Sequence, residues 1–242
     1  MALLRAVFFD AAGTLFDARE PVGGTYARIA RQYGITASDE AVTAGFRRAF
    51  DAAPELAFGP GHSAEQLRRK EREWWRAVVA QSFEGLGHFR DFDGFFETLF
   101  AYFADPAHWR ADLEALPTLQ RLKDSGLRLG VISNFDFRLY EILQDLGLSA
   151  IFDSVTISSE VGYAKPRAEV FAAALARHGL RPSEAMHVGD SHRLDFEASH
   201  AVGMAAVLLD PGLDAPTNIE DRKARIRSLA YLKEVTQVLG SA

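Results

Sequence analysis

Two hydrophobic patterns alternate along the chain, and each predicts a different kind of element. Short apolar runs, many of them β-branched and each ending in a polar residue, predict strands buried on both faces. These runs cover residues 6–10, 127–134, 153–159, 185–190 and 205–210. Apolar residues at helical spacing predict helices at residues 112–125, 137–146, 167–178 and 196–202. The alternation predicts an α/β fold with a doubly wound parallel sheet.

The pattern changes between the first predicted strand and residue 110. No convincing buried strand occurs there, and apolar residues recur at three- and four-residue spacing, as in amphipathic helices. These positions are Tyr26, Ile29 and Tyr33; Phe46, Ala49 and Phe50; Leu67, Trp74 and Val78; and Phe95, Leu99, Tyr102 and Phe103. We therefore expect an insert of four helices that bury one another. Residues 221–239 are expected to form a short charged segment and a helix.

Composition narrows the class of protein. The 242 residues are 48% hydrophobic, with no apolar run long enough to cross a bilayer. A net charge of −6 without a basic block argues against a nucleic-acid partner and leaves a small anionic molecule as the expected substrate. The chain has no cysteine, which excludes disulfides and thiolate chemistry. Its start lacks a signal-peptide pattern, so a cytoplasmic location is expected, while the oligomeric state is left open.

Polar side chains at or after the strand ends carry the candidate chemistry. They are Asp10, Ser133, Asn134, Lys165, Asp190 and Asp195. Because ligands bind beyond the carboxyl ends of parallel strands, these residues are expected to converge on one crevice. Asp10 is the candidate nucleophile, and Asp10 with Asp190 offers the oxygen ligands that Mg²⁺ prefers. Ser133 and Asn134 can donate hydrogen bonds to phosphoryl oxygens, and Lys165 can balance the negative charge.

Taken in chain order, these segments resemble the four motifs of the haloacid dehalogenase-like (HAD) hydrolase superfamily. The motifs are Asp10-x-x-Gly13-Thr14-Leu15-Phe16, Ile132-Ser133-Asn134, Lys165-Pro166 and Gly189-Asp190-Ser191-x-x-x-Asp195. The resemblance implies a Rossmann-like catalytic core at residues 1–15 and 111–242, with a helical cap at residues 16–110. Arg19-Glu20-Pro21-Val22-Gly23, followed by Tyr26-Ala27, also resembles the branch called haloacid dehalogenase-like hydrolase domain-containing proteins.

The chain departs from the family pattern at Ala12. In typical phosphatases of the family, an Asp at this position protonates the leaving oxygen and activates water, which contributes about 10²- to 10⁴-fold to the rate. The resemblance also implies that the backbone carbonyl of this position binds Mg²⁺, which alanine retains. Asp195 is expected to support the metal indirectly, by holding a metal ligand in place or through a water molecule. The expected metal residues are therefore Asp10, Ala12, Asp190 and Asp195.

Several activities remain open at this point. The first is a Mg²⁺-dependent phosphatase that acts on a small phosphorylated metabolite through an aspartyl-phosphate on Asp10, with Ser133 and Lys165 as further catalytic residues. A metal-independent 2-haloacid dehalogenase would also need no second Asp, because halide leaves without a proton. A phosphonoacetaldehyde hydrolase would need an imine-forming lysine in the insert, where Lys70 is the single candidate. The last alternative is a protein that binds a phosphorylated ligand or a partner with little turnover.

Other residues that could be catalytic are expected to be structural. His187 lies inside an apolar strand and is interpreted as a buried histidine without a catalytic role. His192 lies within the fourth motif but is also left out of the predicted site. Trp74, Trp75 and the phenylalanines of the insert are interpreted mainly as helix-packing residues.

Overall fold

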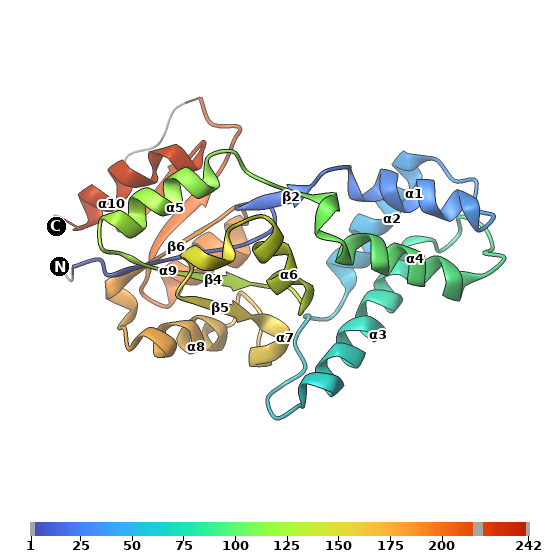
Figure 1. The fold of residues 1–242 in the computed structure, drawn as a ribbon, viewed down its shortest axis with the longest axis horizontal. Coiled ribbons are helices and arrows are strands. Elements are labelled where there is room, and N and C mark those ends of the chain that lie inside the picture. Colours follow the sequence, from blue (N-terminus) through green and yellow to red (C-terminus); the bar gives the residue numbers. More distant parts are fainter. Residues whose placement is uncertain (1–2, 215–219, 241–242) are drawn as a thin grey trace.

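Six parallel strands form the centre of the structure, a computed structural model that describes residues 3–214 and 220–240 (Figure 1). They are β1 (Ala6–Phe9), β4 (Arg128–Ser133), β5 (Ser154–Ile157), β6 (Ala185–Gly189), β7 (Ala205–Leu209) and β8 (Lys223–Ile226). Their order in the sheet is β5-β4-β1-β6-β7-β8. The chain passes from β1 to β4 on one side and later returns to β6 on the other, so β1 lies where the strand order reverses. The predicted doubly wound parallel sheet is confirmed.

Helices cover both faces of the sheet, which explains why its strands are apolar throughout. In β1, Val7 and Phe9 pack on one face and Ala6 and Phe8 on the other. The first face is covered by α5 (Ala115–Asp124), α6 (Arg138–Asp145) and α10 (Leu232–Gly240), and the second by α8 (Ala168–His178) and α9 (Ala198–Ala201) (Figure 1). Shorter helical turns are α7 (Ser158–Val161), a π-helix at His192–Glu197, and 3₁₀ turns at Pro106–His108, Ser149–Ile151, Pro182–Glu184 and Leu229–Tyr231.

The helix expected within residues 221–239 is confirmed as α10, but the sequence did not predict that part of the charged segment before it forms the edge strand β8. Lys223 and Arg225 alternate there with the buried Ala224 and Ile226. This two-residue period buries one face of the strand against the rest of the protein and leaves its charges at the edge of the sheet. Two of the four residues of β8 are charged, so the hydrophobic pattern of the sequence did not predict a strand there.

A helical insert separates β1 from β4, as expected, and lies to one side of the sheet (Figure 1). Its helices are α1 (Val22–Gln32), α2 (Asp39–Ala52), α3 (Ala64–Ser82) and α4 (Phe92–Ala104). Side chains of Ser38, Ser63 and Asp91 cap the amino termini of α2, α3 and α4. Phe50 is an exception to the predicted packing, since 44% of it is exposed. The four-helix prediction is confirmed, while the domain boundaries drawn around it stay a prediction.

Close backbone approach fixes the first two helices of the insert. A Cβ atom at Gly23 on α1 would lie 2.6 Å from the Cα atom of Thr43 on α2. The neighbouring Gly24 has no such restriction, because its nearest atom would be 3.4 Å away on Asp39. Gly23 therefore allows α1 and α2 to pack in direct contact.

Two short strands that the sequence did not predict connect the insert to the sheet. β2 (Phe16–Ala18) and β3 (Trp109–Ala111) pair in antiparallel fashion, with Phe16 opposite Ala111. The ring of Phe16 packs edge-on against that of Trp109, with 5.5 Å between their centroids. The two crossings of the chain are thus joined directly beyond the end of β1.

A second junction joins α3 of the insert to α7, which follows β5. Ser159 Oγ on α7 donates to Oε1 of Glu71 on α3, and Ser158 Oγ donates to the carbonyl oxygen of Leu56 at 2.7 Å. Glu71 is only 1% exposed, and burial raises its pKa to about 7. The hydrogen bond from Ser159 opposes this shift, whereas the charge of Asp136 adds to it. The junction is therefore sensitive to the charge on Glu71.

We expect Glu71→Gln to make the protein more stable at pH 8. The pKa of Glu71 is higher in the folded than in the unfolded protein, so its stabilising contribution is complete below about pH 4.5 and is lost as the pH rises through about 7. The glutamine should raise the free energy of unfolding at pH 8 on the order of 2 kcal/mol, with little gain at pH 4.5. Urea unfolding at both pH values measures this, with Glu73→Gln at an exposed position of α3 as the control. Equal stability of wild type and Glu71→Gln at pH 8 would contradict the expectation.

Candidate active site

Asp10 lies directly after β1, at the carboxyl edge of the sheet. Its backbone N–H donates to the carbonyl oxygen of Val188 on β6 at 2.9 Å. The chain then turns sharply through Gly13, which has a φ of +88°. A Cβ atom at Gly13 would lie 2.6 Å from Oδ2 of Asp190, so glycine is needed for both the backbone angle and the space. Thr14 Oγ1 donates to Oδ1 of Asp190 at 3.2 Å, which ties the nucleophile turn to the fourth motif.

Lys165 places a buried cation between two carboxylates. Its Nζ donates to Oδ1 of Asp10 at 2.7 Å and to Oδ1 of Asp195 at 2.6 Å. Lys165 is 3% exposed and Asp195 is 1% exposed, so water screens their attraction poorly. The structure brings together the predicted residues of the first, third and fourth motifs.

Asn134 holds the backbone of Lys165. Its Nδ2 donates to the carbonyl oxygen of Lys165 at 2.9 Å, and its Oδ1 accepts from the N–H of Lys165 at 2.8 Å. Both polar atoms of the side chain are thus used to position the lysine. Ser133 lies beside it at the end of β4 and is buried. Substrate binding by the Ser133 and Asn134 groups stays a prediction.

His187 is buried, as expected, and the structure adds that it contacts a residue of the site. Its Nε2 lies 2.8 Å from Oδ1 of Asp195, the same oxygen that accepts from Lys165. The backbone N–H of Ser191 donates to the other oxygen of Asp195 at 3.1 Å. The sequence contains one indication of this contact: His187 and Gly189 are two residues apart in a strand, so they lie on the same face of it. In the structure, Asp195 packs against Gly189 on that face.

The turn that carries Asp195 differs from the predicted helix at residues 196–202. A π-helix runs over His192–Glu197, and α9 begins only at Ala198. Asp195 lies inside the π-helix, with its carboxylate bonded to the residues before that turn. Such wide turns are frequent at functional sites, and hydrophobic spacing does not distinguish them from an α-helix. The His192 side chain is 67% exposed and pairs with Glu197 at 3.7 Å, away from this cluster.

The charges in the cluster shift one another's pKa values. Burial raises the pKa of Asp10 and outweighs the nearby Lys165. Burial alone would also raise the pKa of Asp195, but Lys165 and His187 hold it well below its usual range. For Lys165, the two carboxylates overcome the effect of burial and raise the pKa. Burial and the charges of Asp10 and Asp195 raise the pKa of Asp190 to about 6. The site therefore holds excess negative charge on the side of Asp190.

A metal ion would suit this excess charge. One carboxylate oxygen from each of Asp10, Asp190 and Asp195 lies within 4.8 Å of the others. Carboxylate oxygens are the ligands of hard divalent cations, and a cation here would relieve the repulsion that raises the pKa of Asp190. Because three donors already engage Asp195, it is suited to support the ion rather than to bind it directly. The donor set thus fits a metal ion held mainly by Asp10 and Asp190.

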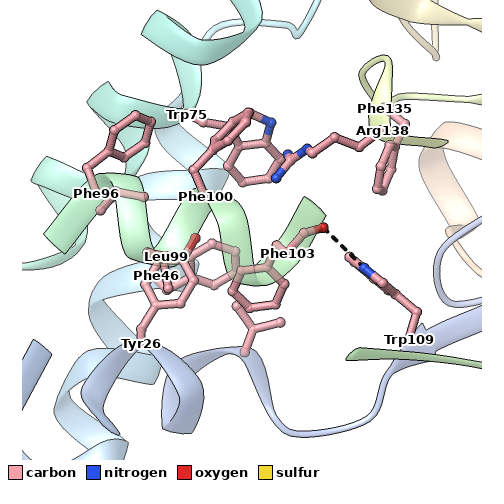
Figure 2. Close-up of a pocket in the computed structure, with 12 residues that line it drawn as sticks. Tyr26, Phe46, Trp75, Phe96, Leu99, Phe100, Phe103, Trp109, Phe135 and Arg138 are labelled. Carbon is pink, nitrogen blue, oxygen red and sulfur yellow. Dashed lines mark hydrogen bonds between the residues drawn. The ribbon is translucent and has the colours of Figure 1, made fainter. Parts of the chain in front are cut away.

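The loop after β4 and the first residue of α6 face the helical insert and form a second buried ion pair. Arg138 donates to both oxygens of Asp136, at 2.8 Å and 2.5 Å, and Trp75 Nε1 on α3 donates to Oδ2 of Asp136 at 2.6 Å. The guanidinium of Arg138 also lies over the ring of Phe100, with 4.4 Å to its centroid (Figure 2). Trp75 therefore joins the insert to the loop that follows Ser133 and contains Asn134. This contact goes beyond the packing role expected for Trp75.

Comparisons with known proteins agree with the four motifs. A family model described as haloacid dehalogenase-like hydrolase matches residues 4–203. The mouse protein "Haloacid dehalogenase-like hydrolase domain-containing protein 3" is 36% identical over 212 residues, which cover 85% of this chain and 82% of that protein. A glyceraldehyde 3-phosphate phosphatase from Methanopyrus kandleri is 35% identical over 100 residues, 41% of this chain and 43% of its own length.

Solved structures of two activities share the fold. A HAD phosphatase from Thermococcus onnurineus aligns with a TM-score of 0.64 and 25% identity, covering 96% of this chain and 97% of its own. A 2-haloacid dehalogenase from Pseudomonas syringae aligns with a TM-score of 0.66 and 23% identity, covering 98% and 99%. The fold therefore does not choose between the two reactions. Among the residues described, no helix is both long and apolar enough to cross a lipid bilayer.

We expect Lys165→Met to destabilise the fold far more than Asp10→Asn. The methionine leaves Asp10 and Asp195 buried without their cation, which costs about 3–5 kcal/mol. The asparagine leaves Lys165 paired with Asp195 and removes a carboxylate whose ionisation burial disfavours, so the change should stay below about 1 kcal/mol. Urea unfolding at pH 7.5 in EDTA measures both. Similar losses in the two variants would show that the lysine does not hold the cluster together.

Proposed function

The chain belongs to the haloacid dehalogenase-like hydrolase family, and we propose that it is a Mg²⁺-dependent phosphatase acting on a small phosphorylated metabolite. The observation that carries this proposal is the cluster of Asp10, Asp190 and Asp195 beside the buried Lys165. A nucleophilic carboxylate needs positive charge nearby to meet a phosphate dianion, and this cluster has a lysine and oxygen ligands for a cation. One relative, the glyceraldehyde 3-phosphate phosphatase from Methanopyrus kandleri, also supports phosphate-ester hydrolysis as the reaction.

In the proposed reaction, a carboxylate oxygen of Asp10 attacks the phosphorus atom. The bond from phosphorus to the leaving oxygen breaks, and the leaving group takes its electron pair. In the structure, Lys165 donates to both Asp10 and Asp195. During the reaction it stays paired with Asp195, and its positive charge beside Asp10 stabilises the negative charge on the transferring phosphoryl group. Water then attacks the phosphorus atom of the aspartyl-phosphate, and the bond from phosphorus to Asp10 breaks. Asp10 keeps the electron pair as a carboxylate, and the protons of the water leave with the phosphate product.

The remaining residues position these groups. Asn134 fixes the backbone of Lys165, and His187 fixes the carboxylate of Asp195 that receives the lysine. Mg²⁺ bound by Asp10, Asp190 and the backbone carbonyl of Ala12 would draw the phosphate oxygens toward the nucleophile and neutralise their charge. Ser133 at the end of β4 is proposed to donate to a phosphoryl oxygen.

Ala12 limits the leaving groups that this site can expel. An alkoxide needs a proton as it departs, and the alanine supplies none. A carboxylate or a phenolate leaves more readily without one. Acyl and aryl phosphates are therefore the proposed substrates, with alkyl phosphates much slower.

The other activities have less physical support. A haloacid has a carboxylate of its own, and dehalogenation requires no metal ion to balance it. In this site the negative charges of Asp10 and Asp190 already repel each other, so a second anion without a cation would be unfavourable. The phosphonoacetaldehyde reaction needs a lysine of the insert that reaches the substrate at Asp10, whereas the described contact of Lys70 is with the ring of Phe58 on the loop before α3, 5.6 Å from Nζ to the ring centroid. Retention of Asp10 together with Lys165 argues against a protein that only binds its ligand.

We expect Mg²⁺-dependent release of phosphate from acetyl phosphate and p-nitrophenyl phosphate. EDTA should abolish this release, and Asp10→Asn should lower it at least about 10³-fold because the asparagine amide is a poor nucleophile. The same preparations should release no chloride from L-2-chloropropionate. Chloride release that is indifferent to EDTA would identify a dehalogenase instead, and absence of both products would favour the binding protein.

Ala12→Asp should widen the range of substrates. The new carboxyl group can protonate an alkoxide, so turnover of glyceraldehyde 3-phosphate, an alkyl phosphate, should rise by about 10²-fold or more. Turnover of acetyl phosphate should change little, because its leaving carboxylate needs no proton. Ala12→Asn, which has the same size but no acid, is the matched control. A wild-type enzyme that hydrolyses both substrates equally fast would refute the role given to Ala12.

A further inference from the structure

Trp74 and Trp75 are neighbours on α3, but their indole N–H groups bond to different parts of the structure. Trp75 donates to Oδ2 of Asp136, in the loop after β4, at 2.6 Å. Trp74 donates to the carbonyl oxygen of Pro54, which belongs to the insert, at 2.8 Å. The first bond therefore joins the insert to the loop that contains Asn134, whereas the second stays inside the insert.

Asp136 accepts the bond from Trp75 and is fully buried. Its carboxylate also accepts hydrogen bonds from the backbone N–H, the Nε and an Nη of Arg138. Those bonds join residues two positions apart, so they hold the loop only to the start of α6. Of the hydrogen bonds described for Asp136, the one from Trp75 is the one that fixes its carboxylate from a distant part of the chain.

Apolar packing leaves room beside this loop. An apolar cavity of about 80 Å³ lies between the insert and the loop, and Trp75, Phe135 and Arg138 are among the residues that line it (Figure 2). Side chains that border a void have no atoms to contact on that side, so they lose part of their dispersion attraction. A directed hydrogen bond to a buried carboxylate can therefore set the position of the loop where packing does not.

The loop connects the contact with Trp75 to Lys165. Asn134 lies two residues before Asp136, and its side chain bonds to both the N–H and the carbonyl oxygen of Lys165. Nζ of Lys165 in turn donates to Oδ1 of Asp10 at 2.7 Å. A displacement of the loop would therefore move Asn134, and the backbone of Lys165 would move with it.

We propose that Trp75 is a positioning residue for the phosphatase reaction. By holding Asp136, it fixes the loop after β4. Through Asn134, this loop keeps the ammonium group of Lys165 beside Asp10. The described contacts of Trp75 include neither Lys165 nor Asp10, so its effect passes through the loop. This inference rests on the proposed phosphatase function, because a misplaced ammonium group slows phosphoryl transfer while the substrate still binds.

Hydrogen exchange at the backbone N–H of Lys165 tests the positioning without turnover. Asn134 Oδ1 accepts from this N–H, so its protection measures how firmly the loop holds the lysine. Exchange is followed by NMR relative to the amides of β1, which report global unfolding. We expect Trp75→Phe, which removes the indole N–H, to lower this relative protection at least about tenfold, as loss of a hydrogen bond to a carboxylate predicts. The matched control, Trp74→Phe, removes a bond inside the insert and should stay within about twofold of wild type.

A second variant removes the same N–H without changing the shape of the side chain. Benzothienylalanine in place of Trp75 has sulfur where the indole has nitrogen, and it should reproduce the result of Trp75→Phe. It also decides the question if Trp75→Phe does not fold. Unchanged relative protection of the Lys165 N–H in this isostere would overturn the proposal, because the effect of Trp75 would then lie in its packing. An equal loss in Trp74→Phe would also overturn it, since any loosening of α3 would then suffice.

Steady-state kinetics on acetyl phosphate with Mg²⁺ separate this inference from the proposed function. We expect Trp75→Phe to lower kcat about tenfold and to leave KM within about threefold, because the variant misplaces a charge that acts in the transition state. Trp74→Phe should match wild type in both constants. An unchanged kcat in Trp75→Phe would overturn the inference and leave the phosphatase intact. Absence of phosphate release from wild type would overturn the phosphatase and with it the catalytic role given to Trp75, whatever the exchange result.

Discussion

The buried ammonium group of Lys165 is the interaction on which the rest of the site depends. Three carboxylates crowd the carboxyl edge of the sheet, and Lys165 pairs with two of them, Asp10 and Asp195. Buried charges are tolerated only when they are paired and hydrogen-bonded, which explains why other polar groups serve the lysine. Asn134 holds its backbone, and His187 holds the carboxylate of Asp195. Within residues 3–214 and 220–240, no lysine or arginine forms an ion pair with the third carboxylate, Asp190, which suits a metal ion.

The same site combines strong polarity with an apolar surface. Lys165 and the carboxylates lie at or after the strand ends, whereas Ala12 and Phe16 in the following turn pack in the main hydrophobic cluster, where Phe16 contacts Trp109. The nucleophile turn thus separates a charged half, suited to a phosphoryl group, from an apolar half. This arrangement fits a substrate whose leaving group is stable as an anion. Such a leaving group needs no proton from an acidic side chain, and the apolar side of the turn offers none at Ala12.

The insert is attached to the rest of the protein at several points rather than by its two crossings alone. β2 and β3 pair beyond the end of β1, Trp75 reaches Asp136, and Glu71 meets Ser159 on α7. Two of these contacts use buried acidic groups, so the position of the insert is linked to their charge.

Hydrophobic periodicity in the sequence determined the parallel sheet, the helices on its faces and the four-helix insert, since each follows from a local pattern of burial. It missed β8, where charges alternate with small apolar residues, and the π-helix around Asp195, which has no distinct spacing. The motifs also gave the residues at the strand ends. Only the tertiary structure decided that His187 joins Asp195 and Lys165, and that an apolar cavity lies beside Phe135. These depend on distances between segments far apart in the chain, and no local pattern encodes such distances.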